Sequence, residues 1–432
     1  MISAVVVVFI IGYLLIVFEH PLNINKTASA LLTGILCWVL IAVMTPDSSV
    51  LELAKGKDFH HWIKSELSHH LSGISEVLFF LLGAMTIVEV IDSHNGFRKI
   101  TDLIQSKNPI VLIWILTWVA FFLSALLDNL TTSIVMVSLL RKLLKDKEMR
   151  MYIAALIIIA ANAGGAWSPI GDVTTTMLWV GGQVSSSALI PKLIVPSILN
   201  LLVPLLVVSF MLRKNKVLEV PAKTETQSRV AGENLILFLG LGGLIMVPVF
   251  KSLTDLPPYA GVLLVLSIVW ASAEWLHKSK SKEDKMAFLP SNALARIDTP
   301  SILFFLGILL AVSALETLEI LSHLATQLEV WIGNQNLIVF TIGLASAVVD
   351  NVPLVAASIG MYDLSVFPLD HSLWIFLAYA TGTGGSILII GSAAGVAVMG
   401  MENINFLWYL KRISFLALLG YLSGCLYYVA FL

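Results

Sequence analysis

Five acidic residues interrupt otherwise apolar stretches of the sequence: Glu89, Asp128, Asp172, Glu316 and Asp350. One carboxylate at the centre of a membrane helix costs on the order of 3 kcal/mol on insertion scales, so such residues are usually functional. The interiors of these stretches contain no lysine or arginine. Several buried carboxylates without a base predict a site for cations, because an anion carrier would be expected to keep a positive charge there.

Oxygen-bearing side chains surround three of these acids. Asp128 and Asp350 are each followed directly by an asparagine, and two threonines follow Asp172 closely. Carboxylate, amide and hydroxyl oxygens suit small hard cations rather than soft metals. We expect Asp128 and Asp172 to be the main ligands of such a cation. The neighbours expected to complete the ion shell are Asn129, Asn162, Thr174 and Thr175.

Simpler interpretations exist for some of these acids. An aspartate at a hairpin tip is a good helix N-cap, a role that does not exclude ion binding. Glu89 lies near the end of an apolar run and is either an accessory acid or a water-facing residue. Glu316 lies close to the end of another run, which favours a solvated position. Two histidine pairs lie between apolar runs, in a sequence that predicts an amphipathic segment at the membrane surface. A functional role for these histidines is left open: His60, His61, His69 and His70.

Composition places these residues in a membrane protein. Of the 432 residues, 58% are hydrophobic and 12% are charged, whereas about a quarter are charged in a typical soluble domain. This excludes a soluble enzyme. A formal net charge of −2 offers no basic surface for nucleic acid. Cys37 and Cys425 lie in apolar runs and predict neither a disulfide framework nor a zinc site.

Apolar runs of about 20 residues predict membrane-spanning helices. The first run has no basic residue before it and no small-residue cleavage site after it, so it is predicted to be a span and not a signal peptide. The simple spans are expected at 2–18, 27–45, 74–91, 189–212, 234–250, 258–276, 300–318 and 407–430.

Four further apolar stretches are too long for one simple crossing. Stretches 109–142 and 335–361 each carry an Asp-Asn pair near the middle, which predicts re-entrant hairpins. Stretches 151–183 and 373–400 are interrupted by glycines, which predicts crossings made of two half-helices. Non-helical backbone at membrane depth is tolerated only where it is buried in protein or lines a wet cavity. The interruptions therefore mark the candidate site.

These features occur twice along the chain. Three motifs recur in the same order, 220 to 225 positions later, which indicates an internal duplication. The matches are 78–81 with 303–306, 124–130 with 346–352, and Gly164-Gly165 with Gly384-Gly385. The predicted division of the chain is a first repeat at 1–215, a cytoplasmic linker at 216–233 and a second repeat at 234–432.

The distribution of basic residues predicts how the repeats are oriented. If the hairpins do not cross, each repeat makes five crossings, so the second repeat enters the membrane upside down. In this topology 21 of the 26 lysines and arginines fall on one side, which the positive-inside rule assigns to the cytoplasm. Both termini are then external. The predicted fold is an all-α polytopic membrane protein of two inverted repeats, each with five crossings and one re-entrant hairpin, with broken helices at the midplane.

Segments 124–132, 162–175 and 346–353 resemble motifs of the NhaD-type sodium/proton antiporters of the ion transporter superfamily, and the resemblance covers essentially the whole chain. It implies which residues form the ion and proton path. That path comprises Ser124, Asp128, Asn129, Asn162, Asp172, Thr174, Thr175, Ser346, Asp350 and Asn351, with Ser386 and Ser392 as weaker carry-overs and Glu89 as an accessory acid.

The resemblance also implies the activity. We expect a secondary transporter that exchanges cytoplasmic Na⁺ for external H⁺ and contributes to pH homeostasis, with Li⁺ left open as a second ion. Na⁺ and H⁺ would compete for Asp128 and Asp172 in an alternating-access cycle. The expected partners are these ions and the lipid bilayer, with no cofactor, no nucleic acid and no enzymatic activity. The expected location is a bacterial inner membrane, and a homodimer is left open.

Two other functions are compatible with parts of the sequence. A sodium-coupled dicarboxylate carrier or an arsenite carrier of the same superfamily could hold an anion with hydroxyls and helix N-termini, although a buried base is missing. An intramembrane aspartyl protease would also need two membrane aspartates. Its Gly-x-Gly-Asp signature is absent, because Pro169 stands where the first glycine belongs before Asp172.

Overall fold

The computed structural model consists of helices joined by short connections, with no strand in any part of the chain that it describes. The described residues are 2–22, 24–46, 48–54, 57–97, 108–212, 230, 232–279, 281 and 285–432. Most of the predicted linker at 216–233 lies outside them, and the end of that range, Glu233, already belongs to a helix.

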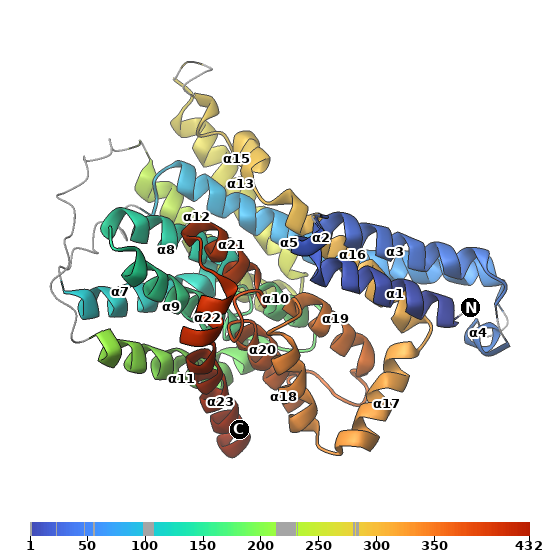
Figure 1. Ribbon diagram of the computed structural model, residues 1–432. Coiled ribbons are helices and arrows are strands. Elements are labelled where there is room, and N and C mark those ends of the chain that lie inside the picture. The colour runs from blue at the N-terminus through green and yellow to red at the C-terminus, as the bar shows by residue number, and fades with distance from the viewer. Residues whose placement is uncertain are drawn as a thin grey trace.

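In the part of the chain that the structure describes, ten helices precede the linker (Figure 1). Asparagine or aspartate N-caps start several of them, for example Asn25 and Asn108, whose side chains accept hydrogen bonds from backbone N–H groups. The helices are α1 (Ile2–Val17), α2 (Glu19–Leu22), α3 (Lys26–Val43), α4 (Ser48–Leu53), α5 (Phe59–Ser93), α7 (Pro109–Leu127), α8 (Asn129–Leu143), α9 (Lys147–Ala166), α10 (Val173–Val180) and α11 (Ser186–Leu212).

The remaining helices follow the linker. They are α12 (Glu233–Thr254), α13 (Pro258–Leu276), α15 (Pro290–Arg296), α16 (Thr299–Thr317), α17 (Ile320–Ile332), α18 (Gln335–Ala345), α19 (Asn351–Met361), α20 (Ser372–Gly384), α21 (Ala393–Glu402), α22 (Phe406–Arg412) and α23 (Ser414–Phe431).

The prediction of a polytopic helical membrane protein is confirmed. Among the described residues, nine helices are long and apolar enough to cross a membrane. The helix interruptions expected within 109–142 and 335–361 lie between α7 and α8 and between α18 and α19, and those expected within 151–183 and 373–400 lie between α9 and α10 and between α20 and α21. That the first two are re-entrant hairpins stays a prediction. The first leg of the first hairpin, α7, is itself among the nine, and helix length alone does not say whether it crosses. The inversion of the repeats remains a prediction.

Three helices differ in extent from the predicted spans or lie outside them. The third span is not limited to 74–91, because α5 is a continuous helix of 35 residues that already includes the histidine pairs. The segment 319–335, in which no span is predicted, contains the amphipathic helix α17. The last span, expected at 407–430, is divided at Ile413 into α22 and α23.

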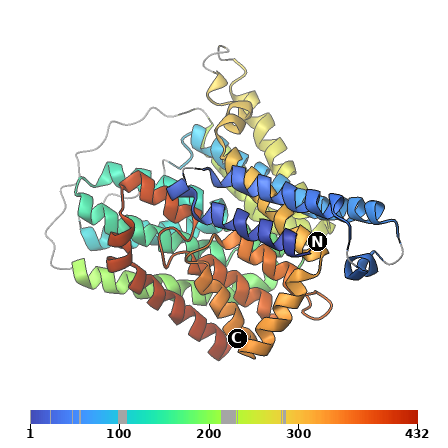
Figure 2. The same cartoon turned by 45° about the vertical axis from the view of Figure 1, so that its right-hand side comes forward.

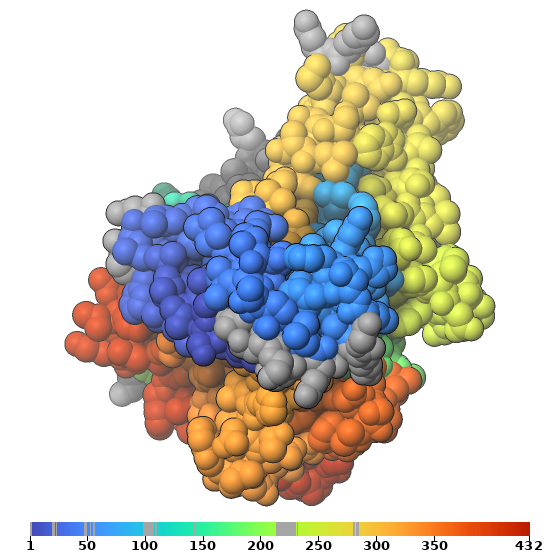
Figure 3. Space-filling view, turned by 90° about the vertical axis from the view of Figure 1, so that its right-hand side faces the viewer, coloured from blue at the N-terminus to red at the C-terminus, as the bar shows by residue number. Residues whose placement is uncertain are grey.

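Helices from the two halves of the sequence pack against each other. The blue α3 lies along the orange α16, and the green α11 lies along the red α23 (Figure 1). The indole N–H of Trp38 on α3 donates to the carbonyl of Leu310 on α16 at 2.9 Å. Figure 2 again shows the blue and orange helices together, and Figure 3 shows the face on which they meet. The molecule is therefore not two separate halves.

The broken helices lie at the centre of the structure. Of the candidate spans, α9 is the most enclosed, with 16 of its 20 residues buried, and its partner α20 is buried from Leu373 to Gly384. The hairpins pack against these central helices, α7 and α8 on α9, and α18 and α19 on α20. This arrangement brings the two hairpin tips and the two helix breaks together.

Candidate functional site

Each hairpin tip is an aspartate that caps the helix after it. Asp128 accepts hydrogen bonds from the backbone N–H of Thr131 at 2.8 Å and from its hydroxyl at 2.9 Å. Asp350 accepts one from the N–H of Val352 at 3.3 Å. The backbone φ is +82° at Asp128 and −49° at Asp350. The capping interpretation is therefore confirmed for both residues, and both side chains also line a cavity.

Each broken helix resumes at a polar N-cap. Asp172 starts α10, and its carboxylate accepts from the N–H of Thr174 at 3.4 Å. Ser392 starts α21, and its hydroxyl accepts from the N–H of Gly395 at 3.1 Å. The two breaks thus share a backbone arrangement and differ in charge.

Glycines allow the hairpins to touch the broken helices backbone to backbone. A Cβ added at Gly164 would lie 2.0 Å from the carbonyl oxygen of Phe121, and one at Gly384 would lie 2.0 Å from that of Gly343. No larger residue fits at either position without movement of the backbone. The two contacts are equivalent, which agrees with the repeated motifs in the sequence.

Two serines of the expected ion path fasten these same contacts. The hydroxyl of Ser124 donates to the carbonyl of Ala161 at 2.6 Å, and that of Ser346 donates to the carbonyl of Thr381 at 2.8 Å. Both serines are fully buried and neither lines the cavity. Their contacts favour a role in holding each hairpin on its broken helix.

One buried network consists entirely of neutral groups. The amide of Asn129 donates to Asn162 Oδ1 at 3.0 Å. The amide of Asn162 donates in turn to the hydroxyl of Ser386 at 2.9 Å and to that of Ser392 at 3.0 Å. The first hairpin tip is thereby linked to the break in the second half of the chain.

The other buried network contains a carboxylate. The amide of Asn351, at the second hairpin tip, donates to Asp172 Oδ2 at 3.3 Å. Gly382 occupies in the second half of the chain the place that Asn162 has in the first, and a Cβ there would lie 3.4 Å from the same oxygen. The absence of a side chain at this glycine leaves room beside the carboxylate. Thr175 braces the turn, because its hydroxyl donates to the carbonyl of Asp172 at 2.8 Å.

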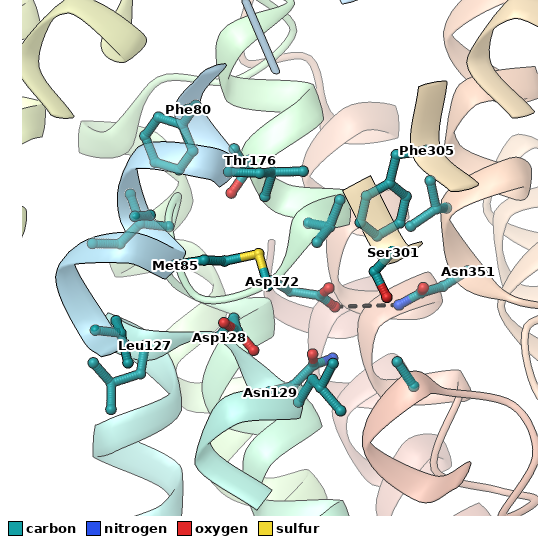
Figure 4. Close-up of a pocket in the computed structure, with 18 of the residues that line it drawn as sticks. Phe80, Met85, Leu127, Asp128, Asn129, Asp172, Thr176, Ser301, Phe305 and Asn351 are labelled. Atoms are coloured by element: carbon teal, nitrogen blue, oxygen red, sulfur yellow. Dashed lines mark hydrogen bonds between the residues drawn. The ribbon is translucent and has the colours of Figure 1, made fainter. Parts of the chain in front are cut away.

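The tips and the charged break face one cavity (Figure 4). Figure 4 shows the carboxylates of Asp128 and Asp172 in the same space, with Met85 beside them and Asn351 across from Asp172. Aromatic and aliphatic side chains form much of the remaining wall. The residues of the cavity that carry charge, amide or hydroxyl groups are Lys26, Asp128, Asn129, Asp172, Thr176, Ser301, Asp350 and Asn351.

A basic residue also lines this cavity, which corrects the expectation that the site has none. The ammonium of Lys26, at the first residue of α3, lies 3.0 Å from Asp350 Oδ2. It also lies 4.5 Å from the ring centre of Phe304. The sequence offered one signal, a single lysine directly before the apolar run at 27–45, but its partner is 324 positions away.

The other expected residues lie outside the cavity. Glu89 pairs with Arg296 on α15, with 3.2 Å between the carboxylate and the guanidinium. Glu316 is exposed beside His70. Thr174, Ser386 and Ser392 are buried behind the cavity wall and do not line it. Sequence reasoning missed Lys26 and also the cavity residues Ser301, Thr176 and Met85.

The carboxylates share the cavity without converging on one point. In the described part of the chain, no three Asp, Glu, His or Cys side chains are close enough to hold a metal ion together. A cation bound here would therefore rely on one or two carboxylates, completed by amide or hydroxyl oxygens and water. This pattern suits a weakly held, exchangeable alkali ion better than a tightly held transition metal.

Comparison with known proteins gives consistent relatives. A family model described as "Citrate transporter" matches residues 13–369. Two Arabidopsis thaliana proteins named "Sodium/proton antiporter 1" and "Sodium/proton antiporter 2" are 46% and 45% identical, over 99% and 98% of this chain and 72% and 98% of their own lengths. "Na(+)/H(+) antiporter NhaD" of Vibrio cholerae is 31% identical over 97% of this chain and 89% of its own length.

These relatives are named antiporters and not enzymes, in agreement with the sequence analysis, and no cofactor is indicated by their names. The resemblance drawn from the three motifs is confirmed over nearly the full chain. The protein belongs to the citrate transporter family and, within that family, to the NhaD-type sodium/proton antiporters.

Proposed function

We propose that this protein is a secondary transporter that exchanges Na⁺ for H⁺ across a membrane. The observation that carries the proposal is the charge in the cavity: three aspartates line it, and Lys26 is the single basic residue among the described residues of its wall. The names of the relatives support the same ion pair.

The mechanism follows from the cost of burying charge. An unpaired carboxylate in a cavity of low polarity is unfavourable, and either a proton or Na⁺ removes that cost. Na⁺ and H⁺ therefore compete for Asp128 and Asp172, and the site changes its exposure most easily when one of them is bound. This competition alone couples the movement of Na⁺ to the opposite movement of H⁺.

The neighbouring groups would tune the affinity for Na⁺. Asn351 already donates to Asp172, and its amide oxygen is free to turn toward a bound cation. Asn129 also lines the cavity. Movement of a hairpin with its broken helix, against the remaining helices, would expose the site to each side in turn. The close glycine contacts at Gly164 and Gly384 support motion of each hairpin and its helix as one body.

The test is the pH dependence of the apparent KM for Na⁺, measured with purified protein in liposomes and a pH-sensitive dye. Competition for one site requires this KM to fall as pH rises, by up to about tenfold per unit for one proton, with little change in the maximal rate. A KM that stays flat from about pH 6 to 9, with only the maximal rate changing, would contradict the competition and require a separate pH sensor.

The same liposomes separate this function from the main alternative. Li⁺ and K⁺ are added in place of Na⁺ to define the ion selectivity. Uptake of a labelled dicarboxylate or citrate, driven by Na⁺ without proton exchange, would instead support an anion carrier. The excess of carboxylates over Lys26 in the cavity disfavours that outcome, because an anion would meet net negative charge.

We also propose that both termini are external, on the basis of the distribution of lysines and arginines. In a variant with Cys37 and Cys425 replaced by alanine, a cysteine at Ser48 should react with an impermeant thiol reagent added outside, whereas one at Lys278 should not. The reverse pattern would overturn the topology. Relatives come from plants as well as bacteria, so the bacterial inner membrane stays a prediction from the sequence.

A further inference from the structure

Lys26 differs from the other residues of the cavity because it brings its own positive charge. Its side chain is 25% exposed and that of its partner Asp350 is 17% exposed, so the pair is largely shielded from water. The ammonium donates a hydrogen bond to Asp350 Oδ2 at 3.0 Å and stacks over the ring of Phe304. A shielded, hydrogen-bonded pair of this kind is worth more than a surface ion pair.

The acidic groups around this ammonium are not equivalent. Glu19 accepts a hydrogen bond from the backbone N–H of Lys26 at 3.1 Å, not from its ammonium. Asp298 caps α16 and accepts from the N–H of Ser301. Asp350 is the carboxylate that the ammonium contacts directly.

The other two aspartates of the cavity lack such a partner. Within the described parts of the chain, neither Asp128 nor Asp172 forms an ion pair with a lysine, arginine or histidine. The cavity therefore contains one neutralised carboxylate and two that are available to an external cation.

The two ends of the ion pair belong to different packing units. Lys26 starts α3, which is joined to α16 so closely that a Cβ at Gly34 would lie 2.5 Å from the carbonyl oxygen of Gly307. Asp350 lies at the tip of the α18–α19 hairpin. The ion pair thus joins the α3–α16 unit to the hairpin.

We propose that Lys26 is a tethered counter-ion of Asp350, which occupies that carboxylate so that Na⁺ and H⁺ exchange at Asp128 and Asp172. This inference rests on the proposed sodium/proton exchange. It makes Lys26 a positioning residue that sets the net charge felt by an entering Na⁺. Removal of the ammonium leaves a third free carboxylate, which attracts Na⁺. Removal of the Asp350 carboxylate leaves an unpaired ammonium, which repels Na⁺.

The two single substitutions should therefore shift Na⁺ affinity in opposite directions. At alkaline pH, where proton competition is weakest, Lys26→Met should lower the apparent KM for Na⁺ by about 3-fold to 10-fold, and Asp350→Asn should raise it by a similar factor. The double variant should return the KM toward the wild-type value. Lys26→Arg, which keeps the positive charge, should resemble the wild type.

A pair that only holds helices together gives a different result. In that case both single variants lose activity in the same direction, the double variant does not recover, and the inference is overturned. The control is Lys64→Gln, which removes an exposed lysine of α5 that does not line the cavity and should leave the KM unchanged.

Two further measurements keep the outcomes distinct. If Lys26→Met does not fold, as judged by size-exclusion chromatography, Lys26→Asp combined with Asp350→Lys retains both the pair and the net charge. A KM near the wild-type value in that swap supports the counter-ion role, and loss of Na⁺ response overturns it. Absence of Na⁺-dependent proton flux in the wild type would instead refute the proposed function itself.

Discussion

The two halves of the chain build the same frame around different chemistry. In both, a hairpin tip ends in Asp-Asn, a serine fastens the hairpin, and a polar residue caps the second half-helix. In the neutral network Asn162 donates a hydrogen bond to the cap residue Ser392. In the charged network Gly382 lies beside the cap residue Asp172 and offers no side chain. The charged network lines the cavity through Asp172 and Asn351, whereas Asn162 and Ser392 lie behind its wall.

This difference shows how one duplicated frame can serve two purposes. Asn162 donates both amide hydrogens and accepts one hydrogen bond, so its side chain is committed to neutral partners. The hydrogen bonds that the described residues donate to the Asp172 carboxylate are long, at 3.3 and 3.4 Å, and leave capacity for a cation. We infer that Asn162 and its two serine partners are structural and that the charged network takes part in exchange.

The strongest test of this division compares the two N-caps. Asp172→Asn should reduce Na⁺-dependent proton flux by about 100-fold or more, because the attraction between a carboxylate and Na⁺ at close range is worth about 4 kcal/mol at an effective dielectric constant of about 20. Ser392→Ala should retain measurable exchange in the same liposome assay. Equal loss in both variants would show that the ion is not centred on Asp172.

Disruption of the neutral network should lower the thermal stability of the protein. Asn162→Ala removes the partner of three buried polar groups, and each unsatisfied group costs about 1 to 3 kcal/mol. We therefore expect a clear fall in the thermal midpoint of the detergent-solubilised protein. Ser392→Ala removes one hydrogen bond from Asn162 and the N-cap of α21, which is worth about 1 kcal/mol, so it should lower the midpoint less. An unchanged midpoint in Asn162→Ala would contradict the structural role.

The smallest expected effect concerns the space beside Asp172. Gly382→Ala places a methyl group 3.2 Å from Ala166 Cβ and 3.4 Å from Asp172 Oδ2, a tight fit that the fold should accept. It should raise the apparent KM for Na⁺ by about 3-fold to 10-fold, equivalent to about 0.7 to 1.4 kcal/mol. Gly400→Ala on α21 is the matched control, because nothing lies within 4 Å of its added methyl group. A similar KM shift in both variants would argue against a role for this space.

Much of the fold was predictable because a membrane helix can be recognised from its own stretch of sequence. The span at 258–276 coincides with α13, and each Asp-Asn pair lies at a hairpin tip as expected. Local sequence also indicated Asp172 at a helix break. These features depend on apolar run length and on residues a few positions apart, which a single sequence displays.

Contacts between the two halves were not predictable. The pairing of Lys26 with Asp350 and of Asn162 with Ser392 depends on how distant helices pack, and no local pattern encodes that packing. The direction in which a side chain points was equally unpredictable from the sequence. Ser124 was expected on the ion path, but its hydroxyl donates a hydrogen bond to the carbonyl of Ala161. Helix α17 has no counterpart among the predicted spans because its 13 residues are too few to cross a membrane.

The backbone of Asp128 has a consequence for the stability of the whole protein. A φ of +82° suits glycine, and a non-glycine residue held there stores on the order of 1 to 3 kcal/mol of strain. Asp350, with its φ of −49°, carries no such penalty. Asp128→Gly should relieve the strain and raise the thermal midpoint, offset in part by the lost cap, while ion exchange falls. The first hairpin tip is then a site where activity is maintained at the expense of stability, and where selection for a more stable protein would favour an inactive one.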